Sequence, residues 1–368
     1  MQKALGAISI SILMGMLAAG LWPFNPSPPN QVTWLPRQNG LRFGEYGTIW
    51  TSSPFRLSDS QGESSVSLEV WLQPAVEQDE NTLLAFCTSQ DPLRFEFQQY
   101  RNGLLVRRNV ADPQGHSRTF EIEIADIFRR NKQVFITVTA GQRMTTVYVD
   151  GRMVKRSPHF GLTRDDLAGQ LVFGTSPVES APWRGNLLGL ALYDRELTET
   201  QVAQNYHRWI QSGRPGNSAK ESPVALYLFE EHTGDLAHDS ARYGRDFNIP
   251  RHFGILQKPV LVMPQRKDLV RWSYWADVFV NVVGFIPLGF FVCAYLSSRR
   301  TRRAALAAIM VGAMVSLTIE ILQVYLPTRD SDMTDLVANT FGTIIGVLSY
   351  RRTIARLFLA SLHRITYA

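Results

Sequence analysis

The stretch TTVYVDGRMVKR (145–156) has the pattern of a β-hairpin. β-Branched and aromatic residues lead into Asp150-Gly151, a pair that favours the type I′ turn because both central residues of that turn need a positive φ. Apolar and polar residues alternate in three further segments: SVSLEVWLQP (65–74), LRFEFQQY (93–100) and QVFITVTA (133–140). Since alternation with a period of two is typical of a β-strand, these segments predict β-strands.

Turn signals separate these strands at regular intervals. Arg101-Asn102-Gly103 marks a second predicted Asn-Gly turn, and the first long helical pattern is LTETQVAQNYHRWI (197–210). Many short strands with frequent turns predict an all-β sandwich of two sheets.

Four of these segments carry a family resemblance: SLEVWLQP (67–74), VFITVTA (134–140), TTVYVDGRMV (145–154) and LVFGTSPVESAPWRGNLLGLALYDRELTETQVAQNY (171–206). Together they resemble the laminin-G-like, concanavalin A-like domain, and the resemblance covers most of residues 32–210. It implies a jelly-roll sandwich of a kind used for carbohydrate or protein recognition, and it implies no single ligand.

A further match to the same family is out of order. ALYLFEEHTGDLAHDS (225–240) resembles the family's opening strand and turn, but it follows the domain and a polar linker (211–223). NGLRFGEYGTIWT (39–51) resembles the second piece, and no opening strand precedes it. We therefore predict a permuted sandwich over residues 32–250, in which 224–250 supplies the permuted part and 224–229 fills the vacant edge.

One acidic motif suggests catalysis. Glucanases of the laminarinase type on this fold use Glu-x-Asp-x-x-Glu, and FEIEIADIF (120–128) places Glu121, Glu123 and Asp126 at this spacing. The second and third acids, Glu123 and Asp126, are each exchanged for the other type, which changes their reach by one methylene where placement within about half an ångström is needed. We interpret the motif as a solvent-facing strand that leads into a turn. The sequence shows no zinc-type His pair, Asp-rich ligand loop or Gly-rich phosphate loop, so we predict no metal and no cofactor.

Charge and cysteine usage point to a membrane protein. The 368 residues carry a net charge of +6, and the clusters SSRRTRR (297–303) and RRTIAR (351–356) flank apolar runs. Cytoplasmic anchoring arginines are placed in this way, so we expect no nucleic-acid partner. Cys87 and Cys293 lie in a polar and an apolar region, and they predict no disulfide framework.

Four apolar segments are candidates for the membrane. Residues 1–24 contain the run Ala4–Gly20, which is either a cleaved signal peptide or an uncleaved anchor, and we favour the anchor. Three further runs are Trp275–Leu296, Ala304–Leu326 and Met333–Tyr350. Their lengths suit the hydrocarbon thickness, so we predict an α-helical transmembrane bundle over 275–350 and a two-part membrane protein as a whole.

The basic clusters set the predicted orientation. The loop 297–303 is cytoplasmic by the positive-inside rule, which puts the loop PTRDSD (327–332) outside. The N-terminus is then cytoplasmic, the sandwich is extracytoplasmic, and 351–368 forms a cytoplasmic amphipathic tail. Residues 251–274 mix apolar, basic and aromatic groups, and we predict that this segment lies at the interface of the inner cell membrane.

The stretch LTIEILQVYLPTRDSDMTDLVANTFG (317–342) places polar groups in this bundle. With the orientation above, seven polar residues fall in the external leaflet: Asn281, Glu320, Gln323, Arg329, Asp332, Asp335 and Asn339. Ionisable groups within a membrane normally face a bundle interior or a wet cavity, so we predict that these residues form a ligand-binding site. We expect Glu320 either to pair with Arg329 or else to have a pKa raised by desolvation.

Structural roles are open alternatives for most of the set. Asp332 and Asp335 can serve as helix-capping residues. The three amides at 281, 323 and 339 can be hydrogen-bond links between helices. Gly284, Gly342 and Gly346 are predicted to let helices approach closely.

Two segments of this region resemble a second family: NVVGFIPLGF (281–290) and SLTIEILQVYLPTRDSDMTDLVANTFGTIIG (316–346). Over roughly 270–350 the chain looks like a VanZ-like membrane domain, a family named for a component of glycopeptide-antibiotic resistance. The resemblance implies that the polar positions Asn281, Glu320, Gln323, Arg329 and Asn339, together with Asp332 or Asp335, belong to the family's motif.

Three functions fit these observations. The first is a cell-envelope binding protein, in which the sandwich binds a glycan or a partner protein and the membrane domain binds a membrane lipid or a lipid-linked glycan. The second is an enzyme on a lipid-linked substrate, with Glu320 as the candidate catalytic acid or base and Arg329 holding phosphate. The third is a structural anchor. We rank them in that order, so catalysis is the less favoured reading.

Overall fold

The structure is a computed structural model, and it describes residues 2–56, 65–111, 117–141, 144–216, 222–241, 245–264, 268–270 and 272–366. Side chains beyond residue 354 lie outside this description. The chain divides into two compact units. The sandwich unit is Ser27–Lys258, and the helical unit combines Met1–Pro26 with Pro259–Ala368.

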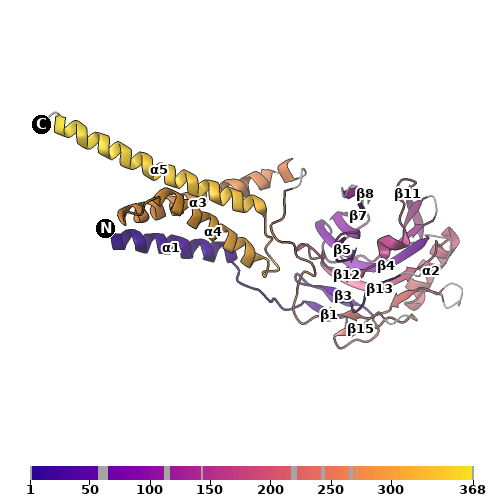
Figure 1. Ribbon diagram of the computed structural model, residues 1–368. Coiled ribbons are helices and arrows are strands. Elements are labelled where there is room, and N and C mark those ends of the chain that lie inside the picture. The colour runs from indigo at the N-terminus through magenta and orange to yellow at the C-terminus, as the bar shows by residue number, and fades with distance from the viewer. Residues whose placement is uncertain are drawn as a thin grey trace. The chain divides into compact units, whose positions relative to one another are not determined.

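The sandwich unit consists of two antiparallel sheets (Figure 1). The first sheet has the order β1 (Val32–Trp34), β2 (Leu41–Phe43), β13 (Gly185–Tyr193), β4 (Val66–Pro74), β9 (Val134–Ala140), β10 (Thr145–Val149) and β11 (Arg152–Ser157). The second has the order β15 (Leu236–Ala237), β16 (Phe247–Asn248), β3 (Ile49–Thr51), β12 (Gln170–Phe173), β5 (Asp79–Cys87), β6 (Phe95–Arg101), β7 (Gly103–Ala111) and β8 (Ser117–Ile124). A short 3₁₀ turn, η1 (Arg164–Leu167), precedes β12.

The core lies between the facing sides of these sheets. Leu68, Val70 and Leu72 of β4 and Phe95 and Phe97 of β6 point into this core and are fully buried. Glu69, between the β4 core residues, is buried as well, because α2 covers the other face of this sheet. Two antiparallel sheets that face each other across a core of aliphatic and aromatic side chains form a β-sandwich, so the predicted all-β sandwich is confirmed.

The two predicted turns differ in outcome. Asp150 and Gly151 have φ of 50° and 75°, so the type I′ turn is confirmed. In the β6–β7 hairpin, Tyr100 pairs with Gly103, which makes Arg101 and Asn102 the turn residues. The prediction of an Asn-Gly turn is therefore wrong by one position, because Gly103 already belongs to β7 and Arg101 takes the positive φ of 55°.

Helix α2 (Glu199–Ser212) covers the outer face of the first sheet. It begins with a capping box between Thr198 and Gln201 and ends at Gly213 in the left-handed conformation. Beneath it lies Glu69 of β4, which is fully buried.

Three side chains donate hydrogen bonds to the Glu69 carboxylate: the Tyr193 hydroxyl at 2.9 Å, Asn205 Nδ2 at 2.9 Å and Trp209 Nε1 at 3.0 Å. Burial raises the pKa of Glu69, and these hydrogen bonds oppose the rise. Since Asn205 and Trp209 belong to α2, the carboxylate holds the helix in place on the sheet.

The segment after the linker joins the first sheet. β14 (Ala225–Tyr227) pairs antiparallel with Leu190–Leu192 of β13, and β15 and β16 extend the second sheet. Residues 217–221 of the predicted linker lie outside the described residues.

The helical unit contains α1 (Gln2–Leu21), η2 (Asp268–Val270), α3 (Trp272–Ser298), α4 (Ala304–Gln323) and α5 (Met333–Thr366). Among the described residues, α1, α3 and α4 are long and apolar enough to cross a membrane. Helix α5 is not among them, and it carries Asp335 and Asn339 in its first two turns.

Three helix boundaries differ from the predicted ones. α3 begins at Trp272, so the end of the predicted interfacial segment 251–274 is already helical; its residues 265–267 and 271 lie outside the described residues. α4 ends at Gln323, three residues before Leu326, because the chain turns there towards Pro327. α5 continues past Tyr350 into the predicted tail, whose side chains from 355 on are not described.

Glycines allow close packing of α3 against α5. A Cβ at Gly342 would lie 2.1 Å from the carbonyl oxygen of Val282, and one at Gly346 would lie 2.1 Å from that of Ile286. The prediction for these two glycines is confirmed. It is wrong for Gly284, where an added Cβ would meet nothing within 4 Å, because this position borders a cavity.

Candidate functional site

The seven predicted site residues gather at one end of the helical unit. They lie on the first half of α3, the end of α4, the α4–α5 loop and the start of α5. Asn281 Nδ2 donates to Asp335 Oδ1 at 2.7 Å and so connects α3 to α5. This hydrogen bond links two helices, which is the structural role considered above for Asn281. It also places the Asn281 amide next to the carboxylate of Asp335.

Glu320 is almost fully buried, with 1% of its surface exposed. Instead of the predicted ion pair with Arg329, its Oε2 accepts a hydrogen bond from the backbone amide of Asp332 at 2.8 Å. The reason is local: Asp332 precedes α5, and its amide lies next to the end of α4. Asp332 Oδ1 in turn accepts from the backbone amide of Thr334 at 2.7 Å, which is the capping role considered for this residue.

Gln323 and Arg329 face the first helix. Gln323 Nε2 donates to the carbonyl oxygen of Gly20 at 2.9 Å, and Arg329 Nε donates to that of Trp22 at 2.8 Å. At the opposite end, Gln2 Nε2 donates to the carbonyl oxygen of Ser298 at 2.7 Å. Helix α1 is therefore hydrogen-bonded to the other helices of this unit near both of its ends.

Asn339 is buried between α4 and α5, with 4% of its surface exposed. Its Nδ2 donates to Ser316 Oγ at 2.9 Å. Among the described residues its Oδ1 has no hydrogen-bond partner. A buried acceptor without a partner is costly, so this oxygen is poised to receive a donor.

Two adjoining cavities open between these side chains. The first, which we name the helical cavity, has a volume of about 350 Å³ and is lined by Met16, Ala19, Gly20, Val280, Asn281, Gly284, Phe285, Ile319, Glu320, Gln323, Arg329, Asp335 and Asn339. The second, of about 360 Å³, is lined by Tyr274, Asp277, Val278, Val280, Asn281, Arg329, Asp330, Asp332, Thr334 and Asp335. All seven predicted residues line one or both, and Asn281, Arg329 and Asp335 line both.

The wall supplied by α1 was not predicted. Met16, Ala19 and Gly20 line the helical cavity, and a Cβ at Gly20 would lie 2.8 Å from Ile319 Cγ2. The small residues at 18–20 were the available signal, but they suit a signal-peptide cleavage site equally well. Their close approach to α4 is visible only in the folded unit.

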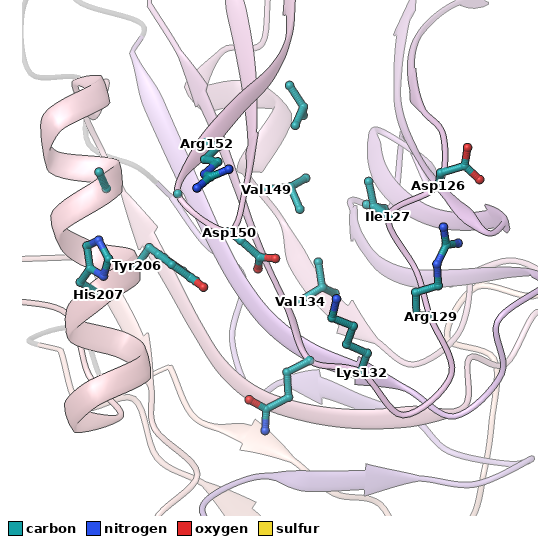
Figure 2. A pocket seen from close by; sticks show the side chains of 14 residues that line it. Asp126, Ile127, Arg129, Lys132, Val134, Val149, Asp150, Arg152, Tyr206 and His207 are labelled. Carbon is teal, nitrogen blue, oxygen red and sulfur yellow. The ribbon is translucent and has the colours of Figure 1, made fainter.

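A third cavity lies in the sandwich unit, and we name it the sandwich cavity (Figure 2). It has a volume of about 760 Å³ and is lined by Asp126, Ile127, Arg129, Lys132, Gln133, Val134, Val149, Asp150, Gly151, Arg152, Val154, Ala203, Tyr206 and His207. The residues come from the β8–β9 loop, the β10–β11 hairpin and α2. Nothing in the sequence pattern predicted this site, because its residues are ordinary surface types.

The acidic motif at 121–126 forms no clustered acidic site. Glu121 on β8 accepts from Arg107 Nε at 2.8 Å, and Glu123 is exposed on the same strand. Asp126 lies in the following turn, where it accepts a hydrogen bond from Asn102. The described residues show no group of three or more His, Cys, Asp and Glu side chains that could hold a metal ion.

The fold and the polar helical unit define the class of protein: a β-sandwich joined to a bundle of membrane-type helices. Family comparisons then specify both parts. The concanavalin A-like lectin/glucanases superfamily matches residues 46–203, and the VanZ/LLP1 family matches residues 222–358. The chain is thus a laminin-G-like domain fused to a VanZ-like domain, as predicted. The VanZ/LLP1 match begins at 222, although residues 222–258 fold with the sandwich unit. A search of curated proteins finds no match.

Solved structures of low sequence identity are similar to part of this chain. A heptameric SAP-like pentraxin from Limulus polyphemus is 15% identical, with a TM-score of 0.33, over 49% of this chain and 80% of its own. A putative carbohydrate binding protein from Bacteroides ovatus is 15% identical, with a TM-score of 0.40, and the match covers 59% of this chain and 61% of that protein. A Ruminococcus gnavus sialidase CBM40 domain bound to α2,3-sialyllactose is 11% identical, with a TM-score of 0.34, and the match covers 45% of this chain and 95% of that domain. The similarity is too low to transfer a ligand.

Proposed function

We propose that this protein is a multi-pass protein of the cell membrane whose helical unit binds an amphiphilic or lipid-linked molecule at the outer leaflet, while its extracytoplasmic sandwich binds an envelope glycan or partner protein. The observation that carries the proposal is the helical cavity. It combines the polar side chains of Glu320, Gln323, Arg329 and Asn339 with apolar side chains from α1, α3 and α4.

This lining suits a molecule with a polar head and an apolar tail. Arg329 can donate to a phosphate oxygen. The carboxylates of Glu320 and Asp335 can accept from sugar hydroxyls, and so can Asn339 Oδ1, which has no hydrogen-bond partner in the described part of the chain. Met16, Phe285 and Ile319 provide apolar surface for a hydrocarbon chain. A phosphate next to a sugar, as in a lipid-linked glycan, presents both kinds of partner at once.

The proposed topology keeps α1 as a permanent helix with a cytoplasmic N-terminus. α1 supplies part of the cavity wall and hydrogen-bonds at both ends to the other helices, so its removal would open the site. The loop 327–332 is then external and residues from 351 on are cytoplasmic. A cysteine introduced at Asp330, which is exposed, should react with a membrane-impermeant maleimide from outside, since both native cysteines are buried.

Native mass spectrometry of the detergent-purified protein tests the binding. We expect a retained lipid, and we expect Arg329→Ala to lose it while the protein keeps its helical content. Gly284→Phe should also expel the lipid, because the side chain would enter the helical cavity, whereas Gly284→Ala should not. The proposal fails if no lipid is retained, or if both Gly284 variants retain it equally.

Native mass spectrometry of the same purified protein also distinguishes the binding proposal from the catalytic alternative. A buried carboxylate beside Arg329 in one cavity favours Glu320 as the acid or base of such an enzyme. Under that alternative Glu320→Gln would accumulate bound lipid-linked substrate and form no product. Under the binding proposal the retained molecule would be the same in both proteins.

A further inference from the structure

The sandwich cavity combines positive charge with an apolar floor. Ile127, Val134 and Val149 form apolar surface at its base, and Val134 is 4% exposed. Around them stand Arg129, Lys132 and Arg152, all exposed. Figure 2 shows Tyr206 and His207 projecting from α2 on one side and Arg129 and Asp126 on the other, with Arg152, Asp150 and Lys132 between them.

The two acidic residues of the lining already have donors. Asp126 accepts a hydrogen bond from Asn102, and Asp150 Oδ1 accepts from the backbone amide of Phe135 at 3.0 Å. Arg129 contacts Glu77 at 3.5 Å. Within the described parts of the chain, the side chains of Lys132 and Arg152 form no hydrogen bond or ion pair with protein. Two cations therefore remain available to an incoming anion.

Tyr206 is held rigidly at the edge of this cavity. Its ring packs on Phe135 with 5.8 Å between centroids, and a Cβ at Gly151 would lie 3.0 Å from Tyr206 Cδ1. Gly151 has a φ of 75°, so a glycine is needed both for the turn and for this approach. Burial, together with the negative charge of Asp150, raises the pKa of Tyr206, which keeps its hydroxyl protonated as a donor.

We infer that the sandwich cavity binds an acidic oligosaccharide, with Lys132 and Arg152 on its anionic group, the Tyr206 hydroxyl on a neighbouring oxygen and a sugar ring over the apolar floor. The inference rests on the proposed glycan-binding role of the sandwich and specifies its ligand class. A sugar ring has an apolar C–H face and many hydroxyl groups. A site that binds it therefore combines an apolar surface with fixed hydrogen-bonding groups, and a site for an acidic sugar adds a positive charge. A protein partner would need a larger contact area than this cavity offers.

The test uses the full chain in nanodiscs of phosphatidylcholine, because maltoside and glucoside detergents carry sugar headgroups that compete. An array should contain carboxylated, phosphorylated and sulfated oligosaccharides, each beside a neutral oligosaccharide of the same length. We expect at least one acidic member to bind at least tenfold more tightly than its neutral counterpart. Tetragalacturonate and its methyl ester form one such pair for titration in solution.

Variants then place the ligand in the cavity. Arg152→Ala and Lys132→Ala should each weaken binding by about tenfold or more, because each removes a charge-assisted hydrogen bond. Tyr206→Phe should weaken it by about threefold, since it removes a neutral donor and keeps the packing on Phe135. Lys155→Ala and Arg130→Ala remove exposed cations that do not line the cavity, and they should leave affinity unchanged.

Different failures have different meanings. If neutral and acidic members bind equally, or if the Arg152 and Lys132 variants bind like the controls, the inference is wrong while the glycan-binding role of the sandwich stands. If inorganic phosphate alone competes as well as the acidic glycan does, the site binds only an anion and the inference is again wrong. If no glycan binds, the proposed role of the sandwich fails too.

Discussion

The helical cavity and the sandwich cavity contain similar kinds of side chain in opposite surroundings. In the helical cavity Glu320 and Asn339 are 1% and 4% exposed and lie between packed helices. In the sandwich cavity Lys132 and Arg152 are exposed and lie on a loop and a strand. Buried polar groups interact strongly but cost much to desolvate, while exposed ones are cheap to keep and weakened by salt. The first arrangement favours selectivity for a shape, and the second favours rapid capture of a charged molecule.

The two units are also locked by different means. Glycines bring the α3 and α5 backbones together in the helical unit, and a buried carboxylate with three donors joins α2 to its sheet in the sandwich unit. These devices can be broken separately, which allows each unit to be tested while the other stays intact.

The largest effect is expected at the α3–α5 contact. Gly346→Leu would place a side chain where a Cβ already lies 2.1 Å from the carbonyl oxygen of Ile286 and 2.7 Å from Phe290 N. Since this obstacle is backbone, the helices must separate, at a cost of about 3 kcal/mol or more. Thermal unfolding in detergent should show the loss. Gly284→Leu, which faces open space, is the matched control and should melt near the wild-type temperature.

A loss of about 3 kcal/mol is expected for Glu69→Ala in the sandwich. The change leaves three buried donors, on Tyr193, Asn205 and Trp209, without their acceptor. Hydrogen exchange should show faster exchange of the α2 amides and unchanged exchange in α3 and α4. Glu123→Ala removes an exposed carboxylate from β8 and should leave α2 protected; equal exposure of α2 in both variants would argue against the lock.

A smaller effect concerns pH. Burial raises the pKa of Glu69 above its usual value of 4.5, so the folded state binds its proton more tightly than the unfolded state does. The resulting stabilisation is complete below pH 4.5 and is lost as the pH rises through the raised pKa of the folded state. Protection of α2 relative to Glu69→Gln should therefore decrease from acid towards neutral pH. A flat difference would show that the hydrogen bonds fully offset the desolvation.

The smallest effect compares the two cavities directly. Raising the salt concentration from about 0.05 M to about 0.5 M should weaken acidic-glycan binding to the sandwich several-fold, because its cations are exposed to screening. Retention of lipid by the helical cavity should change little over the same range. If both respond equally, the contrast in burial between the two sites does not govern their ligand binding.

Local sequence patterns were sufficient to predict a strand or a turn wherever that structure depends only on residues close together in the sequence. Alternation at 133–140 and the Asp150-Gly151 pair specified strand and turn, since both depend on neighbours in sequence. The polar set in the helices was also evident, because a Glu320 or an Asn339 within an apolar run has few explanations other than a partner or a cavity. The pairing of Glu320 was mispredicted because it depends on which donor the α4–α5 loop presents, and that donor is the backbone amide of Asp332.

By itself, the amino-acid sequence determined the two-part architecture, the strand and helix types, and the group of seven polar residues in the apolar segments. Only the tertiary structure decided that α1 completes the helical cavity, that Gly284 borders open space, and that the β8–β9 loop, the β10–β11 hairpin and α2 enclose a basic cavity. The reason is that sequence periodicity indicates which face of a helix or strand is buried, whereas a cavity depends on how elements distant in the sequence approach one another. The residues next to Lys132 and Arg152 in the sequence give no indication of that approach.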